Sequence, residues 1–588
     1  MTYAMAAGTT HARIRSVRLR RVLALAPGLV AALPVAAVAA GLAGTVMMAF
    51  GYPFDDPFAA GGRGMSLRPW HELAATPGIA TSIGLTLRTG IGATVISAAL
   101  AFLVCAWAQG RVLARKAARV AAPLLAVPHS ALALGVAFLI APTGWLVGAL
   151  WPWLTDQPAT AAIAGGGDAH GLALIAALVV KETPFLILVI ADSLRQLPAS
   201  QTMTVARTLG YPGAEAFAKV LLPQIYPRVR IALRAVLALS LSVVDVPLIV
   251  RPGGPGQPPT LAVLALRTLT EGSGDARFAG AAMACLLVAL VIGAIAGWWL
   301  LERAAAALGR AWVERGRRGM ITAMAGRAAA AICALGVAAG ALSLAALFAW
   351  SIAGPWADRA PWPGSLTFAY WFAHGRDAGI AALATLVVAT GATAIALPLA
   401  IGSLECEDRS GVRAAVGPSW LPWVPLLVPQ LAFLPGIRVL LAGTRLDGSW
   451  IAAIATHSIV VLPCLFLAIA GPWRALDRRY ARSARMLGAA PRRVLLRIKL
   501  PLLAVPLLIA CAVAVTASVD QYLPSLFAGS RGVATLTTRA VALASGADWH
   551  AIGVYATLLW SLPLLVCAAA LALSAGRMGA ARRSRMPA

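Results

Sequence analysis

The chain has 588 residues, of which 60% are hydrophobic and only 12% are charged, and its mean hydropathy is +0.81. Soluble domains carry about 25% charged residues, so this composition argues against an ordinary water-soluble domain. The net charge of +27 comes almost entirely from arginine, and the basic residues fall in short loops between apolar runs. We therefore assign the charge to membrane topology and exclude nucleic acid as a partner.

Apolar runs of about 20 residues recur along the chain and predict an all-α polytopic membrane protein in contact with the lipid bilayer. The first run follows a basic segment, 1–22. It is longer than the roughly 7–15 apolar residues of a signal peptide, so we expect it to be retained as a span. With about 20 residues for each transmembrane helix, about twelve spans are predicted. They lie near 24–50, 83–108, 120–142, 170–192, 230–250, 278–301, 328–354, 378–402, 418–442, 450–471, 503–522 and 552–575.

The basic loops predict the orientation, because arginine and lysine accumulate on the cytoplasmic side. They place both termini in the cytoplasm, and we expect a multi-pass protein of the bacterial inner membrane. One loop disagrees, since Glu405, Glu407 and Asp408 outnumber its arginines, but acidic residues count little in this rule. The basic loops are 111–119, 303–327 and 577–585.

The chain reads as two parallel repeats of six spans each. Pro128-His129 in the third predicted span matches Pro429-Gln430 in the ninth. The expected divisions are a cytoplasmic N-terminal segment 1–22, a first half 23–302, a cytoplasmic linker 303–327, a second half 328–576 and a basic tail 577–588.

Two polar segments carry the same pattern, one in each half. The first reads Thr204-Val-Ala206, Gly210, nine further residues, then Val220-x-Leu222-Pro223. The second reads Arg482-Ser-Ala484, Gly488, nine further residues, then Ile498-x-Leu500-Pro501. Glycine permits a sharp bend and proline favours a helix start, so each segment predicts a helix, a glycine bend and a short second helix. The second helix has an apolar face, which on a cytosolic loop indicates a protein partner.

These segments resemble the coupling loops of importer-type ABC permeases, and the surrounding spans fit the same resemblance over nearly the whole chain. The resemblance implies the fold of a type I ABC importer permease. In that family each loop docks on a separate ATPase subunit, two copies in all, and a solute-binding protein delivers the substrate from outside. The leading acid of the family pattern is replaced by Thr204 and Arg482, which puts the usual ion pair there in doubt. The fused two-half form and the runs around Asp245 and Asp520 resemble the ferric iron, thiamine and polyamine branch.

The resemblance places the ATPase contact on matching residues of the two loops, with Phe217 and Leu495 at the position of the family's docking knob. The full set is Ala206, Gly210, Phe217, Val220, Leu222 and Pro223 in the first loop and Ala484, Gly488, Leu495, Ile498, Leu500 and Pro501 in the second.

Charged residues inside predicted spans are candidates for the translocation pathway, because a charge at mid-bilayer costs roughly 2.5–3.5 kcal/mol unless it faces protein or water. Lys181 and Glu182 lie in the fourth span, and two interpretations stay open for them: lining of the pathway, or a structural ion pair. Asp245, Asp520 and Gln521 lie near the outer ends of the fifth and eleventh spans, as pathway groups or as caps of a bend.

His129 and His457 are single polar residues in spans, for which hydrogen bonding between helices is favoured over ligand binding. The sequence shows no metal-ligand constellation, no cofactor motif and no catalytic motif, so we expect neither metal, cofactor nor enzymatic activity. It lacks a GxxxxGK[ST] phosphate loop, so any ATPase is a separate subunit. The alternative function is an ion-coupled secondary transporter that uses Lys181, Glu182 and Asp245. The substrate is not readable from the sequence.

Overall fold

A computed structural model gives the three-dimensional structure of the chain. It describes residues 28, 30–52, 65–108, 123–140, 168, 170–251, 257–271, 276–316, 323–354, 363–410, 421–529, 532–544 and 548–583. The N-terminal basic segment and the basic loop 111–119 lie outside this part. Within it, regular structure is helical apart from one isolated bridge between Ala353 and Leu366, which confirms the predicted all-α class.

In the described residues, nine helices are long and apolar enough to span a membrane, and two further bent pairs of helices pass the same test together. A short apolar helix, His129–Leu139, completes the set. Each predicted span therefore has a helical counterpart. The long helices are Val30–Ala49, α3 (Ile79–Ala108), α8 (Leu172–Arg195), the stretch Gly213–Val250, α14 (Ala276–Glu314), α15 (Ala323–Ser351), α16 (Ala369–Ser410), α19 (Trp450–Ala475) and α26 (Trp549–Arg583).

The predicted ninth span is not one straight helix. It breaks into α17 (Val424–Leu427) and α18 (Gln430–Gly443), and the pair that contains them is bent by 95°. The break falls at Val428-Pro429, where the residue before proline avoids the helical region and takes ψ 127°. The third span breaks at the matching Pro128, after which α5 (His129–Ile140) begins. The two prolines thus give the repeats a shared interruption.

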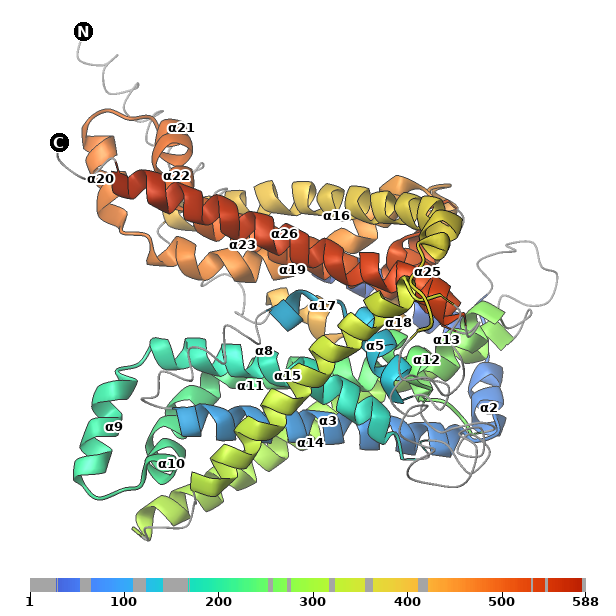
Figure 1. Ribbon diagram of the computed structural model, residues 1–588, viewed down its shortest axis with the longest axis horizontal. Coiled ribbons are helices and arrows are strands. Elements are labelled where there is room, and N and C mark those ends of the chain that lie inside the picture. Colours follow the sequence, from blue (N-terminus) through green and yellow to red (C-terminus); the bar gives the residue numbers. More distant parts are fainter. Residues whose placement is uncertain are drawn as a thin grey trace, which may run out of the picture.

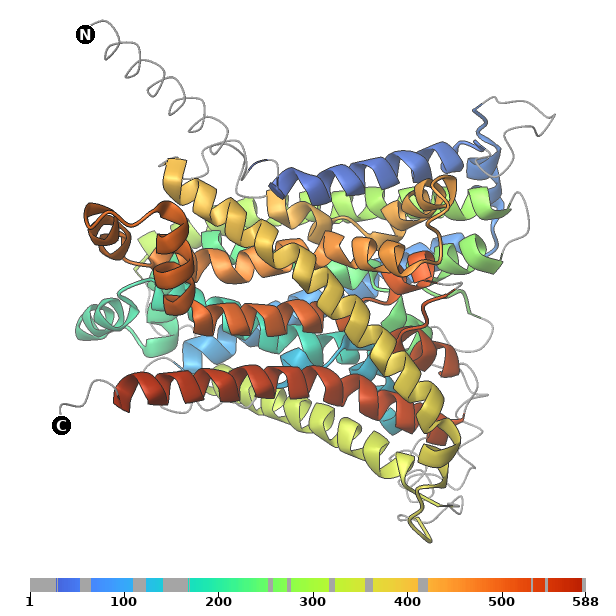
Figure 2. The same ribbon diagram turned by 90° about the horizontal axis from the view of Figure 1, so that it is seen from above.

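Two layers of helices make up the molecule (Figure 1). One contains α3, α8, α11 (Leu222–Ser242) and α14, and the other contains α16, α19, α23 (Ala504–Val519) and α26. The layers diverge toward the end that carries the loop helices α9 and α20, and α5 lies between them nearer the opposite end. The C-terminal part of α26 reaches the loop end in both views (Figures 1 and 2).

The first helix of each half packs on the other half. The backbone N–H of Gly436 in α18 donates to Thr45 Oγ1 of the first helix over 3.1 Å. A side chain at Gly436 would collide with the backbone of Gly41, so the close approach requires glycine. In the same way α15, the first helix of the second half, packs on α3, α5 and α8. The halves are thus held together by exchange of their first helices.

Candidate coupling loops and translocation site

The two repeated segments have the same backbone. Loop 1 (residues 199–223) contains α9 (Ala199–Thr208), α10 (Gly213–Ala216) and one π-helical turn, Phe217–Leu221. Loop 2 (residues 478–502) contains α20 (Arg478–Met486), α21 (Pro491–Val494), a π-helical turn Leu495–Lys499 and α22 (Leu500–Leu502). Each bends at its glycine, with φ of +83° at Gly210 and +79° at Gly488. This is the predicted helix, glycine bend and short second helix.

The alanines of the repeated pattern, Ala206 and Ala484, take part in the glycine bend through their backbone carbonyls. The amide of Tyr211 donates to the carbonyl of Ala206 over 3.1 Å, and the amide of Gly210 donates to Arg207 over 2.9 Å. In loop 2, Ala489 donates to Ala484 and Gly488 to Arg485, both over 3.0 Å. This pair of bonds around a left-handed glycine is the Schellman ending of a helix. The spacing from alanine to glycine is therefore the spacing that this ending requires.

The structure corrects the placement of Phe217. We expected its ring to project as a docking knob, but it is 2% exposed and packs in a core with Leu221, Ile225 and residues of α8. Leu495, Val220 and Ile498 are also packed against buried clusters. The apolar face of each short helix turns inward because it covers the ends of the spans.

Loops 1 and 2 expose several apolar side chains, among them Val205 (59%) and Leu496 (49%), and three of the exposed ones lie next to the glycines. Leu209 is 59% exposed, and Met486 and Leu487 are 89% and 88% exposed. Leu209 and Leu487 each directly precede the glycine of the bend. The helical pattern of the sequence could not reveal them, since they end one helix and do not belong to the amphipathic face of the next.

Loop 1 is fastened by a buried ion pair of its own. Lys219 Nζ lies 2.9 Å from Glu215 Oε1, and both side chains are almost fully buried. The ammonium group also lies 4.6 Å from the ring centroid of Trp312, near the end of α14, a cation–π distance. The short helix of loop 1 is thereby tied to α14.

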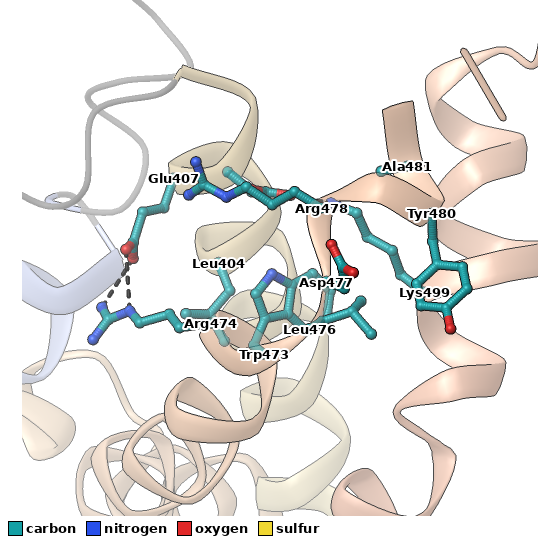
Figure 3. Close-up of a pocket in the computed structure, with 11 residues that line it drawn as sticks. Leu404, Glu407, Trp473, Arg474, Leu476, Asp477, Arg478, Tyr480, Ala481 and Lys499 are labelled. Carbon is teal, nitrogen blue, oxygen red and sulfur yellow. Dashed lines mark hydrogen bonds and ion pairs between the residues drawn. The ribbon is translucent and has the colours of Figure 1, made fainter. Parts of the chain in front are cut away.

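Loop 2 is fastened to α16 instead. Lys499, 2% exposed, bonds Glu405 over 2.6 Å and also Asp408. Arg474 at the end of α19 makes a two-pronged contact with Glu407, at 3.0 and 3.1 Å (Figure 3). These acids are the ones that opposed the basic-loop rule in the sequence. Glu405 and Asp408 serve as counter-ions of loop 2, and Glu407 serves as the counter-ion of α19, which explains their presence on that side. A small pocket between α16, α19 and α20 is lined by Glu407, Asp408, Arg474 and Lys499 and by Trp473 and Tyr480.

The second candidate site is a polar network between the two halves. His129, the first residue of α5, contacts Asp520 twice: the backbone N–H donates to Oδ1 over 2.6 Å, and ring Nδ1 lies 2.6 Å from Oδ2. Ring Nε2 lies 3.3 Å from Glu182 Oε1 in α8. We call His129, Glu182 and Asp520 the central network. His129 was not among the predicted pathway residues; its position directly after the helix-breaking Pro128 was the available signal.

Lys181 does not pair with its neighbour Glu182. Its ammonium donates to the carbonyl oxygens of Leu124 and Leu125, over 3.3 and 3.1 Å, and to that of Val127. These carbonyls end the helical segment before the break at Pro128, so Lys181 caps a helix C-terminus. An ammonium group has three N–H donors, and the three carbonyls use them all.

Asp245 and Gln521 lie close to the network without joining it. Asp245 is 8% exposed and begins α12 (Asp245–Val250); within the described chain no hydrogen bond links it to Lys181 or Glu182. Gln521 donates to the carbonyls of Ala517 and His457 over 3.3 and 3.4 Å. His457 in turn contacts Ser518 at 2.8 Å and Ser525 at 3.0 Å, all within the second half.

The chain is similar to a protein of Escherichia coli (strain K12) described as "Inner membrane ABC transporter permease protein YnjC". The two are 32% identical over 514 residues, which cover 86% of this chain and 90% of the relative. No family model matches the chain.

Proposed function

Because the chain belongs to the permease subunits of ABC transporters, we propose that loops 1 and 2 are the docking sites of two ATPase copies. The protein is the transmembrane permease subunit of an ABC importer, and it crosses the inner membrane several times. A permease of this family works with an ATPase, and usually with a solute-binding protein. The docking residues, the number of ATPase copies and the substrate route go beyond that family assignment.

The observation that carries the docking proposal is the duplicated loop with an exposed apolar tip. Leu209 and Leu487 stand immediately before Gly210 and Gly488, at the same point of the same backbone. Exposed apolar side chains on a polar loop favour a protein contact. Both loops lie at one end of the molecule, so two copies of one ATPase would meet equivalent surfaces (Figure 1).

Leu209→Asp and Leu487→Asp test the docking directly. Each places a charge in an apolar contact, so each should weaken binding of the ATPase by at least tenfold, as expected for a central contact residue. The measurement is the amount of ATPase that co-purifies with the full chain. Leu209→Met and Leu487→Met are the matched controls and should bind normally. Full binding by the double Asp variant, with the chain intact in the membrane, would show that the tips do not dock.

The orientation follows from the same surfaces. The ATPase is cytoplasmic, so the loop end is the cytoplasmic end, and the C-terminal part of α26 lies there too (Figure 1). The solute-binding protein would then deliver substrate at the opposite end, where α13 (Leu261–Glu271) and α25 (Leu536–Leu543) lie. We assign the pathway to the boundary between the halves, where the central network and Asp245 lie.

The ion-coupled alternative is not favoured. It needs Lys181 as a group that gains and loses partners during transport, whereas three backbone carbonyls hold its ammonium. The relative that covers most of this chain is an ABC permease.

A further inference from the structure

In the central network, the side chain of Asp520 joins the second half to the first. Asp520 follows α23, and α23 leads away from loop 2, so the carboxylate lies at the far end of that helix. His129 of the first half reaches it with both its backbone and its ring. α5, which begins at His129, lies between the two layers and nearer the end opposite the loop helices (Figure 1).

His129 also has a partner within its own half. Ring Nε2 lies 3.3 Å from Glu182, against 2.6 Å from Nδ1 to Asp520. A ring that carries an N–H on both nitrogens can donate to both carboxylates at once. The shorter contact is the one that crosses between the halves, and the longer one stays inside the first half.

The two carboxylates differ in access to solvent. The Asp520 side chain is 25% exposed and that of His129 is 17% exposed, whereas that of Glu182 is 4% exposed. If the halves separate, Asp520 can be hydrated. Glu182 stays enclosed and requires a hydrogen-bonding partner, because a buried polar group left without one is destabilising. Lys181 does not serve, since the carbonyls occupy its donors.

We propose that His129 holds the pathway closed between the halves, at the end opposite the loops, and that it releases Asp520 and tightens its contact with Glu182 when that end opens. The proposal rests on the transport function and is independent of where the ATPase docks. The retained contact keeps the imidazole paired in both states, so opening gives up one partner and strengthens the other. A packed element with two such arrangements behaves as a two-state switch.

The two carboxylates consequently have opposite effects. Asp520→Asn weakens the closed arrangement and should raise the ratio of open to closed molecules about tenfold, the effect of losing a charged hydrogen bond of modest strength. Glu182→Gln weakens the open arrangement and should lower that ratio. A residue with only a structural role would not produce changes of opposite sign.

Distances between spin labels at the outer end measure the opening. Arg267 on α13 and Arg539 on α25 are exposed and belong to different halves. Each is replaced by a labelled cysteine in the full chain, after substitution of the native cysteines, and the label-to-label distance is recorded in lipid nanodiscs. In the Asp520→Asn variant a longer distance should gain population, and in the Glu182→Gln variant it should lose population. The double variant should lie between them.

His457→Gln is the matched control, because His457 is also buried and also contacts two side chains, but both lie in its own half. It should leave the distance distribution unchanged. His129→Gln, which keeps the backbone bond to Asp520, guards against loss of folding and should shift the distribution less than Asp520→Asn. An unchanged distribution in Asp520→Asn, or equal shifts in Asp520→Asn and His457→Gln, would overturn the switch while leaving the docking assay of loops 1 and 2 unaffected.

Discussion

Loops 1 and 2 have one backbone and two different attachments. In loop 1, Glu215 and Lys219 pair with each other, and Lys219 lies over Trp312 of α14. The matching positions in loop 2 are Arg493 and Arg497, both exposed, and they cannot form such a pair. Loop 2 is held by Lys499, which bonds two acids of α16.

The difference shows that backbone shape and mechanical attachment are specified separately. The glycine bend and the alanine carbonyl set the shape in both loops. The charged residues then decide which long helix follows the loop: α14 for loop 1 and α16 for loop 2. A movement of the ATPase would therefore be passed to non-equivalent helices of the two halves.

Removal of Lys499 should have the largest effect, a loss of stability that arises from the attachment of loop 2 alone. Lys499→Met removes the ammonium partner of Glu405, which is 5% exposed and keeps Arg409 as an ion-pair partner at 2.7 Å. Loss of one member of a buried pair costs about 3–5 kcal/mol, and we expect a smaller loss here because Glu405 keeps Arg409 and Asp408 is partly exposed. Thermal unfolding of the purified chain measures the loss. Arg497→Met, in the same π-helical turn but exposed, is the control, and an equal loss in the two variants would contradict the attachment of loop 2 to α16.

Substitution of the two glycines tests whether both loops depend equally on the left-handed bend. Gly210→Ala and Gly488→Ala each force a side chain into left-handed backbone, at about 1 kcal/mol. We expect similar losses in stability and similar, partial losses of bound ATPase, measured by unfolding and co-purification. Gly402→Ala inside the C-terminal part of α16, where a methyl group meets open space, should be tolerated. A loss at only one bend would mean that the loops do not share this requirement.

Neutralisation of exposed arginines in loop 2 should have the smallest effect. Arg492, Arg493 and Arg497 are exposed, and exposed charges contribute about 0.2–1 kcal/mol each. Their replacement by glutamine should weaken ATPase binding slightly at loop 2, more at low salt, since charges are screened within about 8 Å at physiological ionic strength. A titration of binding against salt concentration checks this. Equal effects at both loops would assign the arginines to membrane orientation alone.

The sequence predicted the parts of the fold that depend on local pattern. Span positions follow from apolar length, and the bends at Gly210 and Gly488 follow from residue chemistry at fixed spacing. The burial of Phe217 could not be predicted, because an apolar helix face looks the same whether it meets a partner or the protein's own spans. The breaks at Pro128 and Pro429 were visible as prolines, but a run of apolar residues gives no measure of a bend.

The local sequence pattern could not predict contacts between segments that lie far apart in the chain. His129 was expected to bond between helices, and it does, but nothing local indicated that its partner is Asp520 in the other half. Lys181 was judged against charged neighbours, whereas its partners are backbone carbonyls that the break at Pro128 leaves open. The pathway role of Lys181, Glu182, Asp245 and Asp520 remains a prediction.

The exchange of first helices has a consequence for how the protein is made. Thr45 and Gly436, which meet across the halves, are separated by 391 residues of chain. At a synthesis rate of about 5–20 residues per second, the first helix waits roughly 20–80 s in the bilayer before its partner emerges from the ribosome. During that time its small-residue face is open to lipid or to any other helix that passes. Assembly of this permease therefore depends on the timing of synthesis as well as on packing. The first helix is the part most open to non-native contacts with other helices.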